Sequence, residues 1–312
     1  MELLKTLTET PGVPGSEHRI RELITAEIED HVDEINTDAM GNLIAIRKPR
    51  KKGKSRSRKQ PKRVMFAAHM DQIGFYVRHV DDKGFARVNP VGGFDVRNLF
   101  ARRVIVCTQQ GDLPAVMNPA GKPVHLATPD ERNKIPTIHD FYLDFGLATE
   151  QAKKQVQIGD MVVLDQPMME YGDCVVGQCL DDRIGCYVLI AALQKLKLHG
   201  CEVHAVFTVQ EEVGLRGAGT AAFGVKPDVG IALDTTLCCD TPGVPDEMQI
   251  NKLGNGVSIK FMDSSHIADR ALLESFEDVA RKKRIKFQRS ILPAGGTDSG
   301  TIQRSADGVR VL

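Results

Sequence analysis

The sequence feature that most constrains the fold is a short apolar segment followed by two adjacent carboxylates. Residues 203–209 are apolar and rich in β-branched side chains, which predicts a buried strand. Glu211 and Glu212 come one residue later. In open α/β sheets, reactive groups collect beyond the carboxyl ends of strands. Two neighbouring carboxylates in a half-buried crevice require cations to neutralise them, and the alternative is a solvated turn that carries two acids.

The composition is typical of a globular protein that is large enough for two domains. The 312 residues are 42% hydrophobic and 26% charged, and their formal net charge is zero. No global field therefore favours a nucleic-acid or membrane partner. The seven cysteines form no CxxC pair, which is typical of free thiols in a reducing compartment. Because the amino terminus carries acids early and no apolar run reaches transmembrane length, we expect a cytoplasmic protein.

The distribution of predicted strands and helices along the chain indicates a discontinuous α/β domain that is interrupted by a smaller β-rich domain. Residues 73–168 contain short strands separated by glycine and proline turns, which predicts an inserted β-domain. Residues 1–72 and 169–312 alternate strands with amphipathic helices, which is typical of an α/β domain.

Two segments of the second α/β part need a specific interpretation. A helix is predicted after Arg183, and we expect its buried face to consist of Ile184, Val188, Leu189, Ala192 and Leu196. Further along, Gly295 and Gly296 allow another backbone or a ligand to approach closely. Asp298, which follows this turn, either caps a helix or contacts the substrate.

The segment Arg47–Arg63 is strongly basic and contains serine, glycine and proline but no aromatic residue. One interpretation is a patch that binds an anionic polymer, and the other is a solvated loop between two strands. The missing aromatics argue against stacking on single-stranded nucleic acid, so we do not expect such a partner. Anionic-polymer binding stays a hypothesis, which salt-dependent binding of RNA or DNA would test.

Several predicted strands end in residues that can bind a metal ion. They are His69 with Asp71, Glu211 with Glu212, and Asp234, and a fourth apolar segment ends at Asp181 and Asp182. Each alone has an ordinary explanation as a polar pair or a helix cap. Together they would place one imidazole and several carboxylates at one rim of a sheet. Mixed nitrogen and oxygen ligands suit Zn²⁺, Co²⁺ or Mn²⁺, and a shared carboxylate would hold two ions about 3.5–4 Å apart.

Five motifs in this order, AHMDQIGF, CLDDRIGC, VQEEVGLRGA, ALDTT and GGTDSG, resemble the M42 family of metallo-aminopeptidases. The family is related to glutamyl and leucyl aminopeptidases. The resemblance implies a zinc-peptidase-like α/β/α sandwich with an inserted small β-barrel dimerisation domain. It also implies a homo-oligomer, from a dimer up to a hollow tetrahedral dodecamer. The implied activity is the hydrolysis of N-terminal residues from peptide substrates.

The resemblance also implies a role for each candidate site residue. His69 and Asp234 would hold one divalent ion, Glu212 would hold the other, and Asp181 would bridge both, with Asp182 following across an unusual peptide bond that can be cis. Glu211 would be the general base that takes a proton from the attacking water. Asp71 would orient the His69 ring, as such neighbours of metal ligands do.

The sequence departs from the family pattern in one respect. The family carries one more histidine ligand beyond the GGTD turn, and residues Thr301–Leu312 contain no histidine. We therefore expect the second ion to be held weakly and the activity to be impaired. The alternative is a catalytically inactive scaffold or assembly homologue of the same fold, which would bind one ion or none.

Overall fold

The computed structural model describes residues 1–50 and 60–312, so the middle of the basic segment Arg47–Arg63 lies outside the described residues. The described chain divides into two compact units. One unit combines Met1–Arg19 with Asp71–Cys179, and the other combines Ile20–Met70 with Leu180–Leu312. The functional domain boundaries expected from sequence, after residues 72 and 168, stay a prediction.

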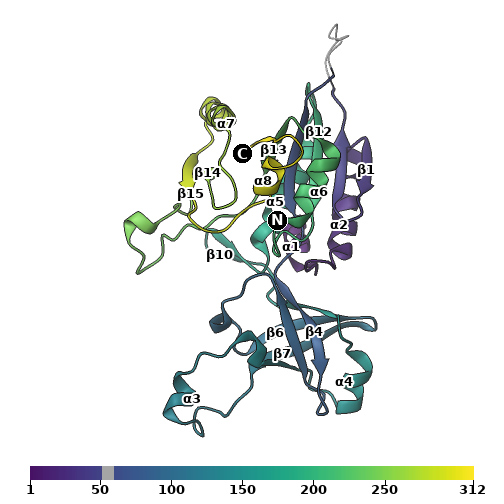
Figure 1. Ribbon diagram of the computed structural model, residues 1–312, viewed down its shortest axis with the longest axis vertical. Coiled ribbons are helices and arrows are strands. Elements are labelled where there is room, and N and C mark those ends of the chain that lie inside the picture. Colours follow the sequence, from purple (N-terminus) through teal and green to yellow (C-terminus); the bar gives the residue numbers. More distant parts are fainter. Residues whose placement is uncertain (51–59) are drawn as a thin grey trace. The chain divides into compact units, whose positions relative to one another are not determined.

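A six-stranded mixed sheet forms the centre of the second unit (Figure 1). Its strand order is β1-β2-β12-β3-β13-β16. The strands are β1 (Glu34–Thr37), β2 (Leu43–Arg47), β12 (Glu202–Thr208), β3 (Arg63–His69), β13 (Val229–Ala232) and β16 (Arg310–Val311). Strands β12, β3 and β13 run parallel to one another, and six of the seven residues of β12 are buried. The buried strand predicted at residues 203–209 is therefore confirmed.

Helices cover both faces of this sheet. Helix α5 (Leu180–Lys195) precedes β12, and α6 (Arg216–Val225) connects β12 to β13 on the far side of β3. The crossovers from β3 to β12 and from β12 to β13 run in opposite directions along the sheet. Since crossovers between parallel strands are nearly always right-handed, this order places α5 and α6 on opposite faces. Helix α8 (Ser299–Gln303) joins α6 in a core with Met65 and Ala67 of β3. This arrangement confirms the predicted α/β/α sandwich.

This unit also contains helix α2 and a small peripheral layer. Helix α2 (His18–Ile28), whose first residues belong to the other unit, buries Ile20, Ile24 and Ile28, which recur at helical spacing. The layer consists of the parallel pair β14 (Val257–Met262) and β15 (Phe287–Ile291) with helix α7 (Arg270–Lys283). None of the helices in the described ranges is both long and apolar enough to cross a bilayer.

The buried face predicted for helix α5 is correct for Leu189 and wrong for Val188 and Ala192, while Ile184 and Leu196 are half-buried. Val188 and Ala192 are exposed, whereas Cys186, Leu189, Ile190 and Leu193 are buried. This part of α5 is apolar on almost every side, so two faces satisfy the helical spacing equally well. The sheet packs against the face that carries the small side chain of Cys186, whose thiol donates to the carbonyl oxygen of His69.

The first unit contains a closed six-stranded barrel of order β4-β5-β8-β7-β6-β9 (Figure 1). Its strands are β4 (Gly74–Val80), β5 (Ala86–Val91), β8 (Phe141–Asp144), β7 (Gly111–Pro119), β6 (Arg102–Thr108) and β9 (Met161–Leu164). Side chains such as Phe75, Val104 and Phe141 fill its interior. The other elements of the unit are α1 (Glu2–Glu9), α3 (Pro129–Asn133), α4 (Thr149–Gln155), and the hairpin β10 (Met169–Tyr171) and β11 (Cys174–Val176).

Asn42 links the end of β12 to the start of α6 through side-chain hydrogen bonds. Its side-chain oxygen Oδ1 accepts from the backbone N–H of Val209 at 3.0 Å, and its Nδ2 donates to the carbonyl oxygen of Gly217 at 3.0 Å. The N–H of Gly217 in turn donates to the carbonyl oxygen of Val209 at 3.1 Å. This three-way contact fixes the direction in which the chain leaves β12 toward Glu211.

We expect Gly217→Ala to lower the free energy of unfolding by about 1–3 kcal/mol or more, because the new methyl group overpacks this contact. A Cβ at this position would lie 2.3 Å from Asn42 Oδ1 and 2.4 Å from the carbonyl oxygen of Val209. The matched control is Gly224→Ala in the same helix, where a Cβ meets nothing within 4 Å. That control should stabilise the protein by about 0.5–1 kcal/mol. Equal midpoints for both variants in urea unfolding would contradict this account.

Candidate metal centre

The candidate centre lies at the carboxyl ends of three adjacent parallel strands. His69 is the last residue of β3 and pairs in register with Thr208, the last residue of β12. On the other side of β3, the N–H of Leu233 donates to the carbonyl oxygen of Ala67, so Asp234 follows at the same edge. The sheet therefore brings together side chains that are far apart in the sequence, as the strand-end pattern predicts.

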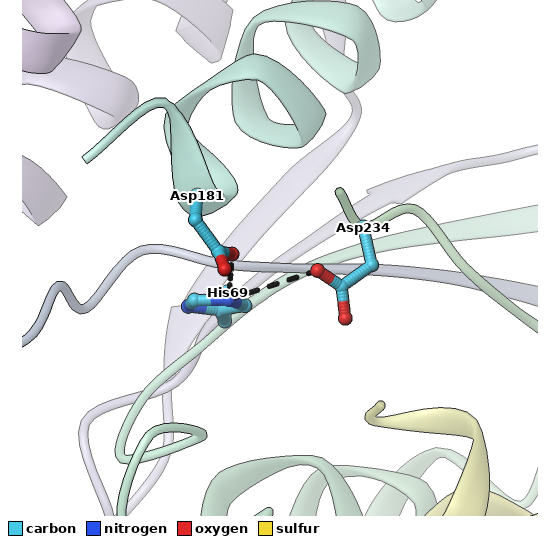
Figure 2. A group of neighbouring side chains, drawn as sticks. All are labelled: His69, Asp181 and Asp234. Carbon is cyan, nitrogen blue, oxygen red and sulfur yellow. Dashed lines mark hydrogen bonds and ion pairs between the residues drawn. The ribbon is translucent and has the colours of Figure 1, made fainter. Parts of the chain in front are cut away.

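Three ligand-type side chains converge on one point (Figure 2). His69 Nε2 lies 3.1 Å from Asp181 Oδ1 and 4.0 Å from Asp234 Oδ1. One ligand atom from each of these three residues lies within 4.8 Å of the others. Glu212 lies in the wall of the same cavity, outside this group of three. His69 is buried, whereas the side chain of Asp181 is 57% exposed and open to an incoming ion.

The structure gives the neighbours Asp181 and Asp182 different environments. The peptide bond between them is cis, and both residues have non-helical backbone angles before the regular part of α5 begins. Asp181 points at His69, as Figure 2 shows. Asp182 is fully buried, and its carboxylate accepts from the N–H of Gly185 at 3.1 Å. Of the two carboxylates, that of Asp181 belongs to the converging group with His69 and Asp234.

Glu211 and Glu212 follow a tight turn after β12. Gln210 adopts a left-handed conformation with φ of 55°, and the carbonyl oxygen of Glu211 accepts from the N–H groups of Gly214 and Leu215. Glu211 Oε2 lies 4.0 Å from His69 Nε2, and its side chain is only 10% exposed. The turn therefore holds the predicted general base beside the converging ligands.

The pKa values of these carboxyl groups reflect burial first and the crowding of like charges second. Burial raises the pKa of Glu211 to about 9, and the nearby Asp298, Asp234 and Glu212 add to this while His69 opposes it. Burial likewise raises the pKa of Asp234 to about 7. Partial loss of hydration would raise the pKa of Asp181 too, but the hydrogen bond and charge of His69 outweigh this effect and lower that pKa. Cations would relieve this repulsion.

We expect the metal-free protein to lose stability as the pH rises from about 4.5 to about 9, and most steeply below about 7, where both Glu211 and Asp234 contribute. Between the unfolded pKa of 4.5 and the folded pKa of about 9, folded Glu211 keeps a proton that the unfolded chain has lost. Raising the pH therefore favours the unfolded chain, by up to about 1.4 kcal/mol per pH unit for each such group. Denaturant unfolding in chelator at several pH values measures this slope. Glu211→Gln should reduce the slope, and an identical slope in the variant would exclude Glu211 as its source.

The cavity around the centre has a volume of about 570 Å³. The three converging residues and both glutamates line it, together with residues that the sequence interpretation did not identify: Lys260, Ser264, Ser265 and Leu292. Gly295 and Gly296 also line it, as expected for a turn that permits close approach. No chemical motif marks Lys260 or the two serines, because they belong to the peripheral layer, whose position depends on tertiary packing.

The two remaining candidate residues are Asp71, which is close to the centre in sequence, and Asp298, which contacts the end of β12. Asp71 is completely buried two residues after His69. Asp298 occupies the N-cap position of α8 without a capping side-chain hydrogen bond, and its carboxylate accepts instead from the hydroxyl of Thr208. Asp298 therefore takes the helix N-cap position, one of the two alternatives expected from the sequence, while its carboxylate links α8 to the end of β12.

Comparison with known proteins identifies the family. Residues 41–312 match the family model described as M42 glutamyl aminopeptidase. An aminopeptidase-like protein of Acetivibrio thermocellus is 41% identical over 99% of this chain and 87% of its own length. The chain belongs to peptidase family M42. This M42 protein is therefore a peptidase, a hydrolase, and the resemblance seen in its five motifs is confirmed.

Solved structures agree with this M42 assignment. An aminopeptidase of the archaeon Desulfurococcus kamchatkensis superposes with a TM-score of 0.91 at 36% identity, covering 99% of this chain and 84% of that one. The TET1 peptidase of Pyrococcus horikoshii, which assembles into a tetrahedron or a large octahedral shell, superposes with a TM-score of 0.84 at 34% identity. That match covers 99% of this chain and 88% of the other.

Proposed function

We propose that this M42 peptidase is a metal-dependent aminopeptidase that removes residues from the free N-termini of peptides. The observation that carries this proposal is the convergence of His69, Asp181 and Asp234 within 4.8 Å in a cavity large enough for an amino-acid residue. An imidazole and two carboxylates form the mixed donor set that suits Zn²⁺, Co²⁺ or Mn²⁺.

The remaining site residues fit a pair of ions. Asp181 has two carboxylate oxygens, and its exposed side chain lines the cavity, so it can be shared between two sites. Glu212 in the cavity wall would supply a ligand to the second ion. Asp71 would hold the His69 ring in its orientation, which keeps the ligand nitrogen directed into the cavity. The raised pKa values of Glu211 and Asp234 support cation binding, since cations would replace the protons held there.

Divalent ions, when bound, would polarise the scissile carbonyl group and make a water molecule more acidic. Glu211 would accept the proton that the attacking water loses and pass it to the amine that leaves. Its position beside His69 suits this task, because a general base must lie within hydrogen-bonding reach of the reacting water. The acidic lining of the cavity would attract the positively charged amino terminus of the peptide, which favours cleavage at that end.

The assembly and location of the protein are part of the same proposal. Because the related TET1 peptidase forms closed shells, we expect this chain to form a homo-oligomer through its barrel unit. None of the seven cysteines, all of which lie in the described residues, is in a disulfide, which suits the reducing cytoplasm.

Hydrolysis of a panel of aminoacyl p-nitroanilides with Zn²⁺, Co²⁺ and Mn²⁺ tests the proposed function. We expect turnover of substrates with a free amino group and none of the same substrates after N-acetylation. Metal analysis of the same samples measures how many ions each chain holds, and fewer than two would indicate an impaired second site. Intact oligomers without turnover under any metal would favour the alternative of an inactive scaffold homologue.

A further inference from the structure

The cavity wall formed by the peripheral layer consists of two interlocked loops, residues 263–266 and 295–298. The N–H of Ser264 donates to the carbonyl oxygen of Gly295 at 3.2 Å, and the N–H of Thr297 donates to Ser265 Oγ at 3.3 Å. Ser265 is packed so closely that a Cβ at Gly296 would lie 2.9 Å from its Cβ. At Gly300 the corresponding distance would be 2.5 Å. The serine therefore fixes the glycine turn by both hydrogen bonding and shape.

Asp263 stabilises the first of these loops, residues 263–266, from a buried position outside the cavity lining. Its carboxylate is buried and accepts from four donors in the same loop: the N–H and Oγ of Ser265, both at 2.8 Å, and the N–H and ring Nδ1 of His266, both at 3.1 Å. Its other oxygen lies 3.3 Å from the Nζ of Lys260. Asp263 does not line the cavity itself, whereas Lys260, Ser264 and Ser265 do.

We propose that Asp263 is a positioning residue for substrate binding, which fixes the cavity wall made by Ser264, Ser265 and the Gly295–Gly296 turn. The inference rests on the proposed aminopeptidase function, because this wall and the candidate metal ligands line one cavity. Hydrogen bonds to a charged, buried acceptor are among the stronger ones in proteins, so four of them on one carboxylate hold the loop in a single conformation. A peptide bound at the centre would lie against a wall that Asp263 keeps in place.

The test compares Asp263 with Glu277, a matched buried carboxylate of the same layer. Glu277 lies on α7, is 1% exposed and accepts from Arg281 and Arg289, and it does not line the cavity. We expect Asp263→Ala to raise the KM for an aminoacyl p-nitroanilide about tenfold or more, while kcat and metal content change less than about threefold. Glu277→Ala should leave KM unchanged. Equal KM changes in both variants, or none in Asp263→Ala, would overturn the proposal.

Two further variants keep the proposal testable if Asp263→Ala does not fold. Asp263→Asn retains an acceptor for Ser265 and His266, so its KM should stay within about threefold of the wild-type value. Ser265→Ala removes only one hydroxyl and should still raise KM several-fold, because Thr297 and Asp263 both lose a hydrogen-bond partner. A wild-type KM in Ser265→Ala would overturn the proposal.

Hydrogen exchange of the metal-free protein separates this inference from the proposed function. Backbone amides of residues 295–300 should exchange at least about tenfold faster in Asp263→Ala, or in Ser265→Ala, than in Glu277→Ala. That result can be obtained even if the wild-type protein hydrolyses no aminoacyl substrate, in which case only the proposed function fails. Unchanged exchange at these residues would overturn the role of Asp263 whatever the activity.

Discussion

Replacing Glu211 with glutamine is expected to reduce kcat by about 10²–10⁴ while leaving the metal content nearly unchanged. Glutamine has the same shape but cannot accept a proton from water. Glu211 lies 4.0 Å from His69 Nε2, close to the converging ligands but outside the group of three. Single-turnover assays with metal analysis of the same preparation measure both quantities.

Glu212→Gln is the matched control for this experiment, because it changes the neighbouring carboxylate in the same way. If Glu212 is a ligand, its replacement should lower metal content and activity together. Parallel loss of metal and activity in Glu211→Gln would reassign Glu211 as a ligand and leave the general base unidentified.

His69→Ala is expected to weaken metal binding by at least about 100-fold and to reduce hydrolysis to background. His69 is the central member of the group, since its Nε2 lies 3.1 Å from Asp181 and 4.0 Å from Asp234. Loss of a supporting neighbour alone costs about 10–100-fold in affinity, so loss of a ligand should cost more. Isothermal titration of the metal-free protein with Zn²⁺ measures the change.

The matched control is His204→Ala, which removes another buried histidine of the same sheet. His204 lies near the start of β12, and its Nε2 is 2.9 Å from Glu202 Oε1, at the opposite end of the strand from the centre. This variant should retain the Zn²⁺ affinity of the wild type. Unchanged Zn²⁺ affinity in His69→Ala would remove His69 from the ligand set.

Much of the fold and the converging group could be predicted from the sequence because both depend on local patterns. The buried strand predicted at residues 203–209 agrees with β12 to within one residue at each end. The positions of His69 and Asp234 follow from the rule that parallel strands end at one edge. Strand β8 has no clear signal in the sequence, because it has only four residues.

Other features could not be predicted because they depend on contacts between distant segments. The face of α5 was assigned correctly only in part because the spacing of its apolar residues allows two orientations. The wall around Ser265 comes from two loops that have ordinary turn sequences, so their interlocking is visible only in the structure. The hydrogen bond between Thr208 and Asp298 likewise joins residues 90 positions apart.

The contact between His69 and Asp181 also bears on how the family could have acquired its barrel. These two residues flank residues 71–179, and their side chains are only 3.1 Å apart. The chain therefore leaves the α/β unit after His69 and returns to it at Asp181, and these two points lie close together. An inserted segment whose two ends lie this close together can be lengthened, exchanged or replaced by a short linker during evolution without moving the residues that flank it.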